Sequence, residues 1–255
     1  MFPYRDDNPT LRTPVVTWLL IAANVAVWVL VEGMGSDPAL AKSVCELALI
    51  PAELLGRVGP GTVVRIGPDA SCALGEAVTW YTPLTSMFLH GGWLHLIGNM
   101  WFLHVFGNNV EDSMGHGRYL AFYILCGLVA AATQTLVHPG STIPMLGASG
   151  AIGGVMGAYV ILYPLVRVHM FIFLGLFFFR YAVPAYFMLG YWFLLQVLSG
   201  LPALSQRGDM GGTAFWAHIG GFAAGMLLVF FFQNPTLVAQ HRAVLAAHPH
   251  YGRIS

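Results

Sequence analysis

Charged residues are absent from long stretches of this sequence, which makes the number of membrane crossings the first question. A helix needs about 20 mostly apolar residues to cross a bilayer, and six stretches of about that length remain when the chain is divided at turn signals. Only 9% of the 255 residues are charged, whereas soluble domains carry about 25%. The sequence therefore predicts an all-α polytopic membrane protein with six transmembrane helices. It excludes an ordinary cytosolic enzyme, a disordered chain and a nucleic-acid-binding protein.

The six predicted spans form one domain, residues 14–232, between short polar tails at residues 1–13 and 233–255. The spans lie between Arg12 and Glu32 and at about 93–110, 119–137, 144–164, 181–200 and 214–232. A further apolar stretch, residues 168–179, would cover only about 18 Å as a helix, less than the hydrocarbon core of about 30 Å. We therefore expect an interfacial or re-entrant segment there.

The distribution of arginine predicts the orientation of the chain. If the N-terminus is inside, seven arginines fall on the inner side, and the short outer loops hold only Arg207. Cytoplasmic loops carry the excess of Lys and Arg, so both termini are expected in the cytoplasm and the long loop 33–80 outside. The seven inner arginines are Arg5, Arg12, Arg118, Arg167, Arg180, Arg242 and Arg253.

Two of the three cysteines, Cys45 and Cys72, lie in the loop 33–80. In an oxidising compartment they can form a disulfide that stabilises the loop by roughly 3 kcal/mol. Two free thiols are the alternative, because the distance between Cα atoms cannot be read from a sequence. Cys126 lies in the middle of the third span and is expected to be a small core residue.

Three of the predicted spans begin with polar residues. His95 and Asn99 lie on one face of the second span, being four residues apart. Ser149 lies about 8 Å along the fourth span, counted from Pro144 at about 1.5 Å per residue, and His218 is near the start of the sixth. Because alternate spans run in the same direction, all four side chains are expected to converge on one cavity near the outer surface.

This set of side chains suits acyl transfer, in which a histidine base activates a serine and fixed donors stabilise an oxyanion. No Asp or Glu lies in these three spans, so we predict a dyad of Ser149 and His218 without a carboxylate. Glycines at 147, 150, 221 and 225 predict close packing of the fourth and sixth helices. A serine in a glycine-rich helix or a single buried histidine is often only structural, but the shared depth of the three motifs favours catalysis.

At these residues the sequence resembles the rhomboid intramembrane serine proteases, over about residues 15–232. The matching motifs are His90 to Asn99 with Met100, Gly147-Ala148-Ser149-Gly150, and Ala217-His218-Ile219-Gly220-Gly221 continuing to Gly225. A predicted turn at Val110-Glu111-Asp112 is also similar to the family's segment after the second helix.

The resemblance implies that Ser149 is the nucleophile and His218 the general base and acid. It also implies an oxyanion hole made by His95, Asn99 and the Ser149 backbone N–H, beside Gly147, and a structural role for His90. Loss of one such donor costs about 2.7 to 4 kcal/mol in comparable sites.

The expected substrates are single-span membrane proteins with a helix-destabilising segment near the outer surface, cleaved without a cofactor or metal ion. The expected location is a bacterial inner membrane, with the active site open to the outer face. Some relatives place an aromatic residue one turn after the nucleophile, where this chain has Gly153. The residue that orients His218 therefore stays open between Trp216, Phe222 and the fifth span.

Two other functions are alternatives to proteolysis. A non-catalytic rhomboid-like protein that binds or escorts membrane proteins typically lacks the serine or the histidine, and both are present here. The ten histidines suggest a transporter or metal-handling channel, but transporters often show repeats around a midplane site, which this sequence lacks. The tail histidines His241, His248 and His250 are expected to be solvated. The oligomeric state is not predicted.

Overall fold

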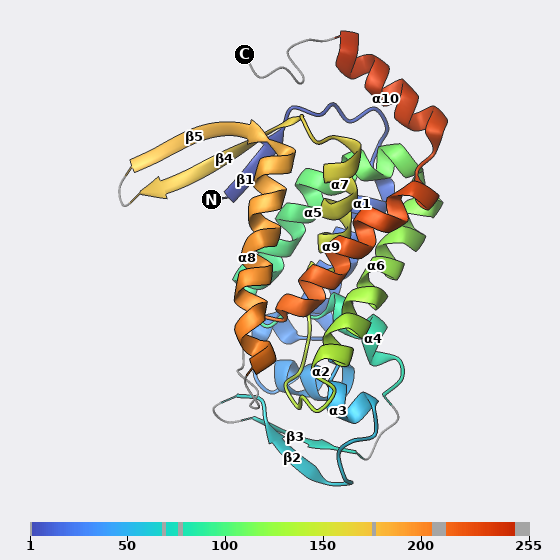
Figure 1. The fold of residues 1–255 in the computed structure, drawn as a ribbon. Coiled ribbons are helices and arrows are strands. Elements are labelled where there is room, and N and C mark those ends of the chain that lie inside the picture. The colour runs from blue at the N-terminus through green and yellow to red at the C-terminus, as the bar shows by residue number, and fades with distance from the viewer. Residues whose placement is uncertain (1, 68–69, 76–78, 175–176, 206–212, 248–255) are drawn as a thin grey trace.

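The structure is a computed structural model that describes residues 2–67, 70–75, 79–174, 177–205 and 213–247. The chain is mostly helical, and Figure 1 shows the elements along the chain. The long helices are α1 (Val15–Leu30), α5 (Trp93–Met114), α6 (His116–Val137), α7 (Ser149–Leu162), α8 (Ala185–Ser205), α9 (Phe215–Phe232) and α10 (Pro235–Ala247). The shorter ones are η1 (Gly33–Gly35), α2 (Ala39–Leu47), α3 (Pro51–Leu54), α4 (Thr82–Thr85) and η2 (Ser86–Phe88).

A helix occupies each of the six stretches that the sequence analysis marked as spans. Among the described residues, α6, α8 and α9 are long and apolar enough to cross a membrane, while α1 and α7 are apolar but shorter. The 22-residue helix α5 runs four residues beyond its predicted end and includes Glu111 and Asp112. The predicted turn at these residues is therefore wrong, because they belong to the last turns of a helix.

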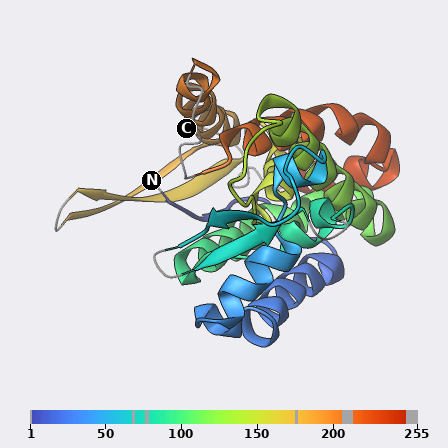
Figure 2. The ribbon, with the colours of Figure 1, turned by 90° about the horizontal axis from the view of Figure 1, so that it is seen from below.

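The structure is not purely α-helical as predicted, because it also contains two small antiparallel sheets. Strands β4 (Arg167–Leu174) and β5 (Phe177–Pro184) form a hairpin over the apolar stretch 168–179, and β1 (Phe2–Asp6) pairs with β4. The hairpin projects sideways from one end of the helices (Figures 1 and 2). A short run of aromatic and β-branched residues cannot be assigned to helix or strand by periodicity alone, which is why the sequence did not show this hairpin.

Helix α7 lies in the interior of the bundle, with most of its residues buried. It packs against α5, α6 and α9, whereas α8 lies at the margin of the bundle in both views (Figures 1 and 2). Because successive long helices run in opposite directions, α5, α7 and α9 all begin at the end that carries residues 33–80. This arrangement brings the three polar motifs of the sequence to one end of the bundle.

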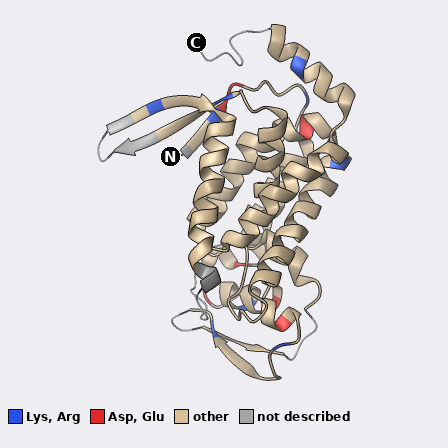
Figure 3. Cartoon of the chain, in the orientation of Figure 1, with Lys and Arg blue, Asp and Glu red and all other residues tan. Residues whose placement is uncertain are grey.

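Among the residues that the structure describes, those with charged side chains lie at the two ends of the bundle and none lies in its middle (Figure 3). At the end opposite the polar motifs, the buried carboxylates of α5 hold the start of the chain. Glu111 accepts the backbone N–H groups of Val16 and Thr17 at 2.9 and 2.8 Å, and Asp112 accepts that of Arg12 at 3.0 Å. Carboxylates are favourable beside a helix N-terminus, whose first N–H groups lack partners in the helix.

The two tails are folded onto the same end of the bundle. His241 of α10 is 0% exposed and lies 2.7 Å from Asn8 Oδ1 through its Nε2, so its expected solvation is wrong. Burial lowers the pKa of His241 to about 4. Burial also raises the pKa of Asp6, which accepts a hydrogen bond from Tyr159, to about 7. The expectations for Arg207, His248, His250 and Arg253 lie outside the described residues.

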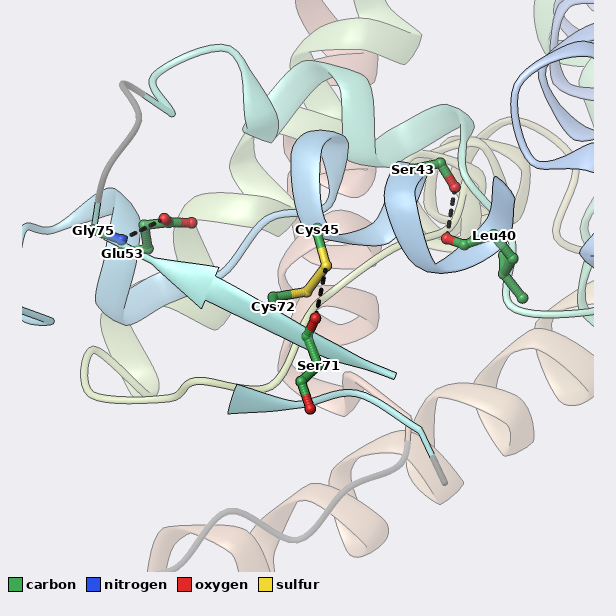
Figure 4. The surroundings of a disulfide bond; sticks show 7 residues. All are labelled: Leu40, Ser43, Cys45, Glu53, Ser71, Cys72 and Gly75. Atoms are coloured by element: carbon green, nitrogen blue, oxygen red, sulfur yellow. Dashed lines mark hydrogen bonds between the residues drawn. A yellow bond between two sulfur atoms is a disulfide. The ribbon is translucent and has the colours of Figure 1, made fainter. Parts of the chain in front are cut away.

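The first loop folds into a small layer over the other end of the bundle. Strands β2 (Thr62–Arg65) and β3 (Ser71–Leu74) form an antiparallel pair, and a disulfide joins Cys72 of β3 to Cys45 of α2 with their Cα atoms 5.3 Å apart (Figure 4). Glu53 accepts the backbone N–H of Gly75 at 2.9 Å. Cys126 is a free, buried cysteine of α6, as expected.

Candidate active site

A cavity of about 1180 Å³ opens beneath the first loop, at the starts of α5, α7 and α9. Its wall includes the five side chains or backbone positions that the sequence analysis singled out. These are His95, Asn99, Gly147, Ser149 and His218. The structure therefore brings all three polar motifs to one space.

Ser149 is the first residue of α7. The estimate of about 8 Å of preceding helix is wrong, because residues 144–148 are not helical. The consequence for chemistry is favourable, since a backbone N–H in the first turn of a helix has no acceptor within the helix and carries the positive end of the helix dipole. The hydroxyl and the N–H of Ser149 are thus both available at the helix start.

His218, on the first turn of α9, lies next to Ser149. Its Nε2 atom is 2.7 Å from the Ser149 hydroxyl oxygen. The close approach of the two helices depends on residues without side chains, because a Cβ at Gly153 would lie 3.2 Å from the His218 carbonyl oxygen. One added at Gly221 would overlap the carbonyl oxygen of Gly150. Small residues that let helix backbones meet are the usual device for such contacts in membrane proteins.

The other face of His218 contacts α8. Gln196 Oε1 lies 2.8 Å from His218 Nδ1, and the Trp192 ring lies 5.8 Å from the imidazole, centre to centre. Trp216 points its indole N–H at the Gly200 carbonyl instead, at 3.2 Å. Of the candidates left open for orienting His218, the fifth predicted span thus supplies the polar partner. Gln196 was missed although it is a strongly polar residue inside an apolar stretch, which was itself the available signal.

His95 points its Nε2 atom at the backbone just before Ser149. The Gly91 N–H donates to His95 Nδ1 at 3.4 Å, so the proton of a neutral ring lies on Nε2, which becomes a donor. A Cβ built on Gly147 would lie only 2.7 Å from that Nε2, and the Gly147 φ of +123° is itself unfavourable for other residues. Glycine at 147 therefore keeps the donor in place.

Asn99 is held by a chain of buried groups that begins at Glu32. Its Nδ2 atom lies 3.0 Å from His90 Nε2, and the His90 backbone N–H donates to Glu32 Oε1 at 2.8 Å. Burial lowers the pKa of His90 to about 3, so the ring is neutral and accepts from the Asn99 amide. The second amide proton of Asn99 stays available for another acceptor.

The arrangement combines a nucleophile, a base in hydrogen-bond contact with it, and donors beside the helix start. Over the parts of the chain that the structure describes, no group of three His, Cys, Asp or Glu residues could hold a metal ion. The contact between Ser149 and His218 and the nearby donors can support nucleophilic attack on a carbonyl carbon with stabilisation of the resulting oxyanion.

The chain is similar in sequence to several known proteins. A family model described as the Rhomboid domain matches residues 77–235. RHOMBOID-like protein 5 of Arabidopsis thaliana is 28% identical over 162 residues, which cover 59% of this chain and 52% of that protein. Rhomboid protease GluP of Bacillus subtilis is 29% identical over 145 residues, covering 57% of this chain and 24% of that protein.

A mitochondrial relative gives a similar result. Rhomboid protein 1, mitochondrial, of Saccharomyces cerevisiae is 28% identical over 169 residues, covering 64% of this chain and 44% of that protein. The match thus spans about half or less of the length of each of these three relatives.

Proposed function

The chain belongs to the rhomboid family, and on that premise we propose that it is an intramembrane serine endopeptidase. It hydrolyses peptide bonds in or near the transmembrane segments of other membrane proteins. The observation that carries the proposal is the 2.7 Å contact between the Ser149 hydroxyl and His218 Nε2 at the wall of the cavity. A nucleophile and a base within hydrogen-bond reach are the first geometric requirement of covalent acyl transfer.

In the proposed reaction, His218 Nε2 takes the hydroxyl proton while Ser149 Oγ attacks the scissile carbonyl carbon. The Ser149 N–H, His95 Nε2–H and the Asn99 amide donate to the oxyanion of the tetrahedral intermediate. His218 then gives the proton to the leaving amine, and the carbonyl carbon stays bound to Ser149 as an acyl-enzyme. Water, deprotonated by His218, attacks the acyl group and releases the acid, which restores the free serine.

The chain is a multi-pass membrane protein. We further propose that all six long helices from α1 to α9 cross the bilayer, with both termini in the cytoplasm and the cavity open to the outer face of a bacterial inner membrane. The distribution of arginine supports this orientation, since the tails and loops on the cytoplasmic side contain most of the arginines, among them Arg5, Arg118 and Arg180. The hairpin of β4 and β5, which carries Arg167 and Arg180, then lies at the inner membrane interface, on the side where Lys and Arg are in excess.

The test is cleavage of a single-span membrane substrate in proteoliposomes, combined with labelling by a fluorophosphonate probe. Ser149→Ala and His218→Ala are expected to abolish cleavage, and Ser149→Ala to abolish labelling, while both proteins keep their thermal stability. Ser199→Ala is the matched control, because Ser199 lines the same cavity but is not the serine in contact with His218 Nε2. Full cleavage by Ser149→Ala would refute the proposal, and a folded wild type that neither cleaves nor labels would favour a non-catalytic binding protein.

A further inference from the structure

Gln196 is the residue that meets His218 on the side away from the nucleophile. The Gln196 side-chain oxygen and His218 Nδ1 are 2.8 Å apart, while His218 Nε2 faces Ser149 at 2.7 Å. Both nitrogens of the imidazole are therefore engaged, one by each neighbouring helix. Gln196 lies on α8, and Ser149 on α7.

The contact has a chemical consequence for His218. To accept the serine proton, Nε2 must be unprotonated, so the single proton of the neutral ring has to lie on Nδ1. The tautomer is set by the hydrogen bond that the other nitrogen makes. A carbonyl oxygen at Nδ1 accepts that proton and selects the tautomer that leaves Nε2 free for Ser149.

The orientation of the Gln196 amide agrees with this assignment. Gln196 Nε2 lies 3.4 Å from the backbone carbonyl oxygen of Trp192, one turn earlier in α8. A carbonyl oxygen can only accept, so it faces the NH₂ group of the amide and leaves the amide oxygen toward His218. The Trp192 ring, whose centre lies 5.8 Å from that of the imidazole, borders the same side of His218.

We propose that Gln196 is a positioning residue that selects the productive tautomer and ring orientation of His218. The inference rests on the proposed protease function and assigns to a neutral amide the place that a carboxylate holds in a Ser-His-Asp triad. Gln196 does not line the cavity, so it acts through His218 and does not touch the substrate.

The contact between Gln196 and His218 depends on the packing of α8 against α9, because the two residues lie on these two helices. Only 22% of the apolar part of α8 is buried, against 39% in α6 and in α9. Near the site the two helices are joined by the Phe193 ring stacked on Phe222, with centres 4.8 Å apart, and by the hydrogen bond from Trp216 to Gly200. A displacement of α8 away from α9 removes the acceptor from His218 Nδ1 and with it the preference for one tautomer.

The first test compares Gln196→Met, Gln196→Glu and Leu195→Ala with the wild type in the same proteoliposomes. Methionine keeps the side-chain length without an acceptor oxygen, glutamate keeps that oxygen, and Leu195 is an exposed neighbour on α8. We expect kcat of Gln196→Met to fall about 10- to 100-fold with KM nearly unchanged. Gln196→Glu should recover most of this loss, and Leu195→Ala should match the wild type.

The second test reads the tautomer without activity. In protein labelled with nitrogen-15 histidine, the His218 signals are those missing from His218→Ala. The wild type is expected to carry the His218 proton on Nδ1, and Gln196→Met to show a mixture that includes the Nε2 tautomer. Thermal unfolding in detergent shows whether a variant has a folding defect. If Gln196→Met does not fold, the tautomer of His218 is compared in Gln196→Leu, at low temperature, and in Gln196→Glu.

The results that would reject the role of Gln196 differ from those that would reject the proposed protease function. A wild-type kcat in Gln196→Met, a Gln196→Glu enzyme as slow as Gln196→Met, or an unchanged His218 tautomer would each reject the role of Gln196. Failure of the proposed function would appear as cleavage by Ser149→Ala. In that case the nitrogen-15 comparison still decides whether Gln196 positions His218.

Discussion

Gly225 of α9 lies so close to Gly154 of α7 that a methyl group on Gly225 would overlap the Gly154 carbonyl oxygen. The same relation recurs one turn earlier, where Gly221 faces the Gly150 carbonyl oxygen. These contacts fix the separation of the two helices that carry the candidate nucleophile and base. Since the obstacle is backbone, it cannot be relieved by the rotation of a side chain.

Gly225→Ala is therefore expected to destabilise the protein by about 3 kcal/mol or more, at the upper end of the usual range for overpacking. The measurement is thermal unfolding in detergent, with cleavage assayed in parallel. Gly190→Ala is the control, because a Cβ there meets nothing within 4 Å and alanine is the better helix former. Equal stability of the two variants would contradict the packing argument.

Gly147→Ala is expected to impair the reaction more than the fold. The new Cβ would displace His95 Nε2, which lies 2.7 Å from that position, and removal of one oxyanion donor lowers kcat about 10²- to 10³-fold. Steady-state cleavage together with thermal unfolding separates the two effects. Gly140→Ala, in an open loop, should leave kcat unchanged, and a Gly147→Ala enzyme with wild-type kcat would remove His95 from the proposed oxyanion hole.

Stability should fall as the pH rises through neutrality, in part because of Glu32. Burial raises the pKa of Glu32 from 4.5 to about 7, so between these values the folded state binds more protons than the unfolded state. The contribution of this group is then present at low pH and is lost as the pH rises through about 7.

Glu32→Gln isolates this effect, because glutamine is neutral throughout and its carbonyl oxygen still accepts the His90 N–H. Between pH 5 and 8 the wild type is expected to lose about 2 kcal/mol more stability than the variant. Asp6, whose pKa is also raised to about 7 by burial, is common to both proteins and drops out of the comparison. Parallel curves of unfolding temperature against pH would contradict the prediction.

The disulfide between Cys45 and Cys72 should stabilise the first loop. It joins residues 27 positions apart, for which the chain-entropy relation gives about 3 to 4 kcal/mol. Cys45→Ser is expected to lower the unfolding temperature, as is a reductant acting on the wild type. The reductant should have no further effect on Cys45→Ser, and a second shift in that variant would mean that the bond is not the cause.

The sequence predicted the helices better than their ends. Length and lack of charge were enough to place six helices, because an apolar stretch of about 20 residues has few alternatives in a bilayer. The start of α7 was misplaced because residues 144–148 are as apolar as the helix that follows. Glu111 and Asp112 belong to the last turns of α5 and not to a turn, because their carboxylates bind backbone N–H groups about 95 to 100 residues earlier, which no local pattern shows.

Part of the candidate site could also be predicted from the sequence, and part could not. Ser149, His218, His95 and Asn99 could be proposed from type and spacing, since polar residues at membrane depth are rare. Gln196 could not be paired with His218, because no spacing rule states which face of one helix meets which face of another. The β4–β5 hairpin and the burial of His241 likewise depend on contacts between segments distant in sequence.

The N-terminal arm bears on how the protein is made. Arg12, Asp6 and Asn8 leave the ribosome well before their respective partners Asp112, Tyr159 and His241, which follow 100, 153 and 233 residues later. The hydrogen bond between Asn8 and His241 cannot form until every long helix of the bundle has been synthesised. The arm is thus synthesised before the bundle but reaches its final contacts late, after α10 has been made.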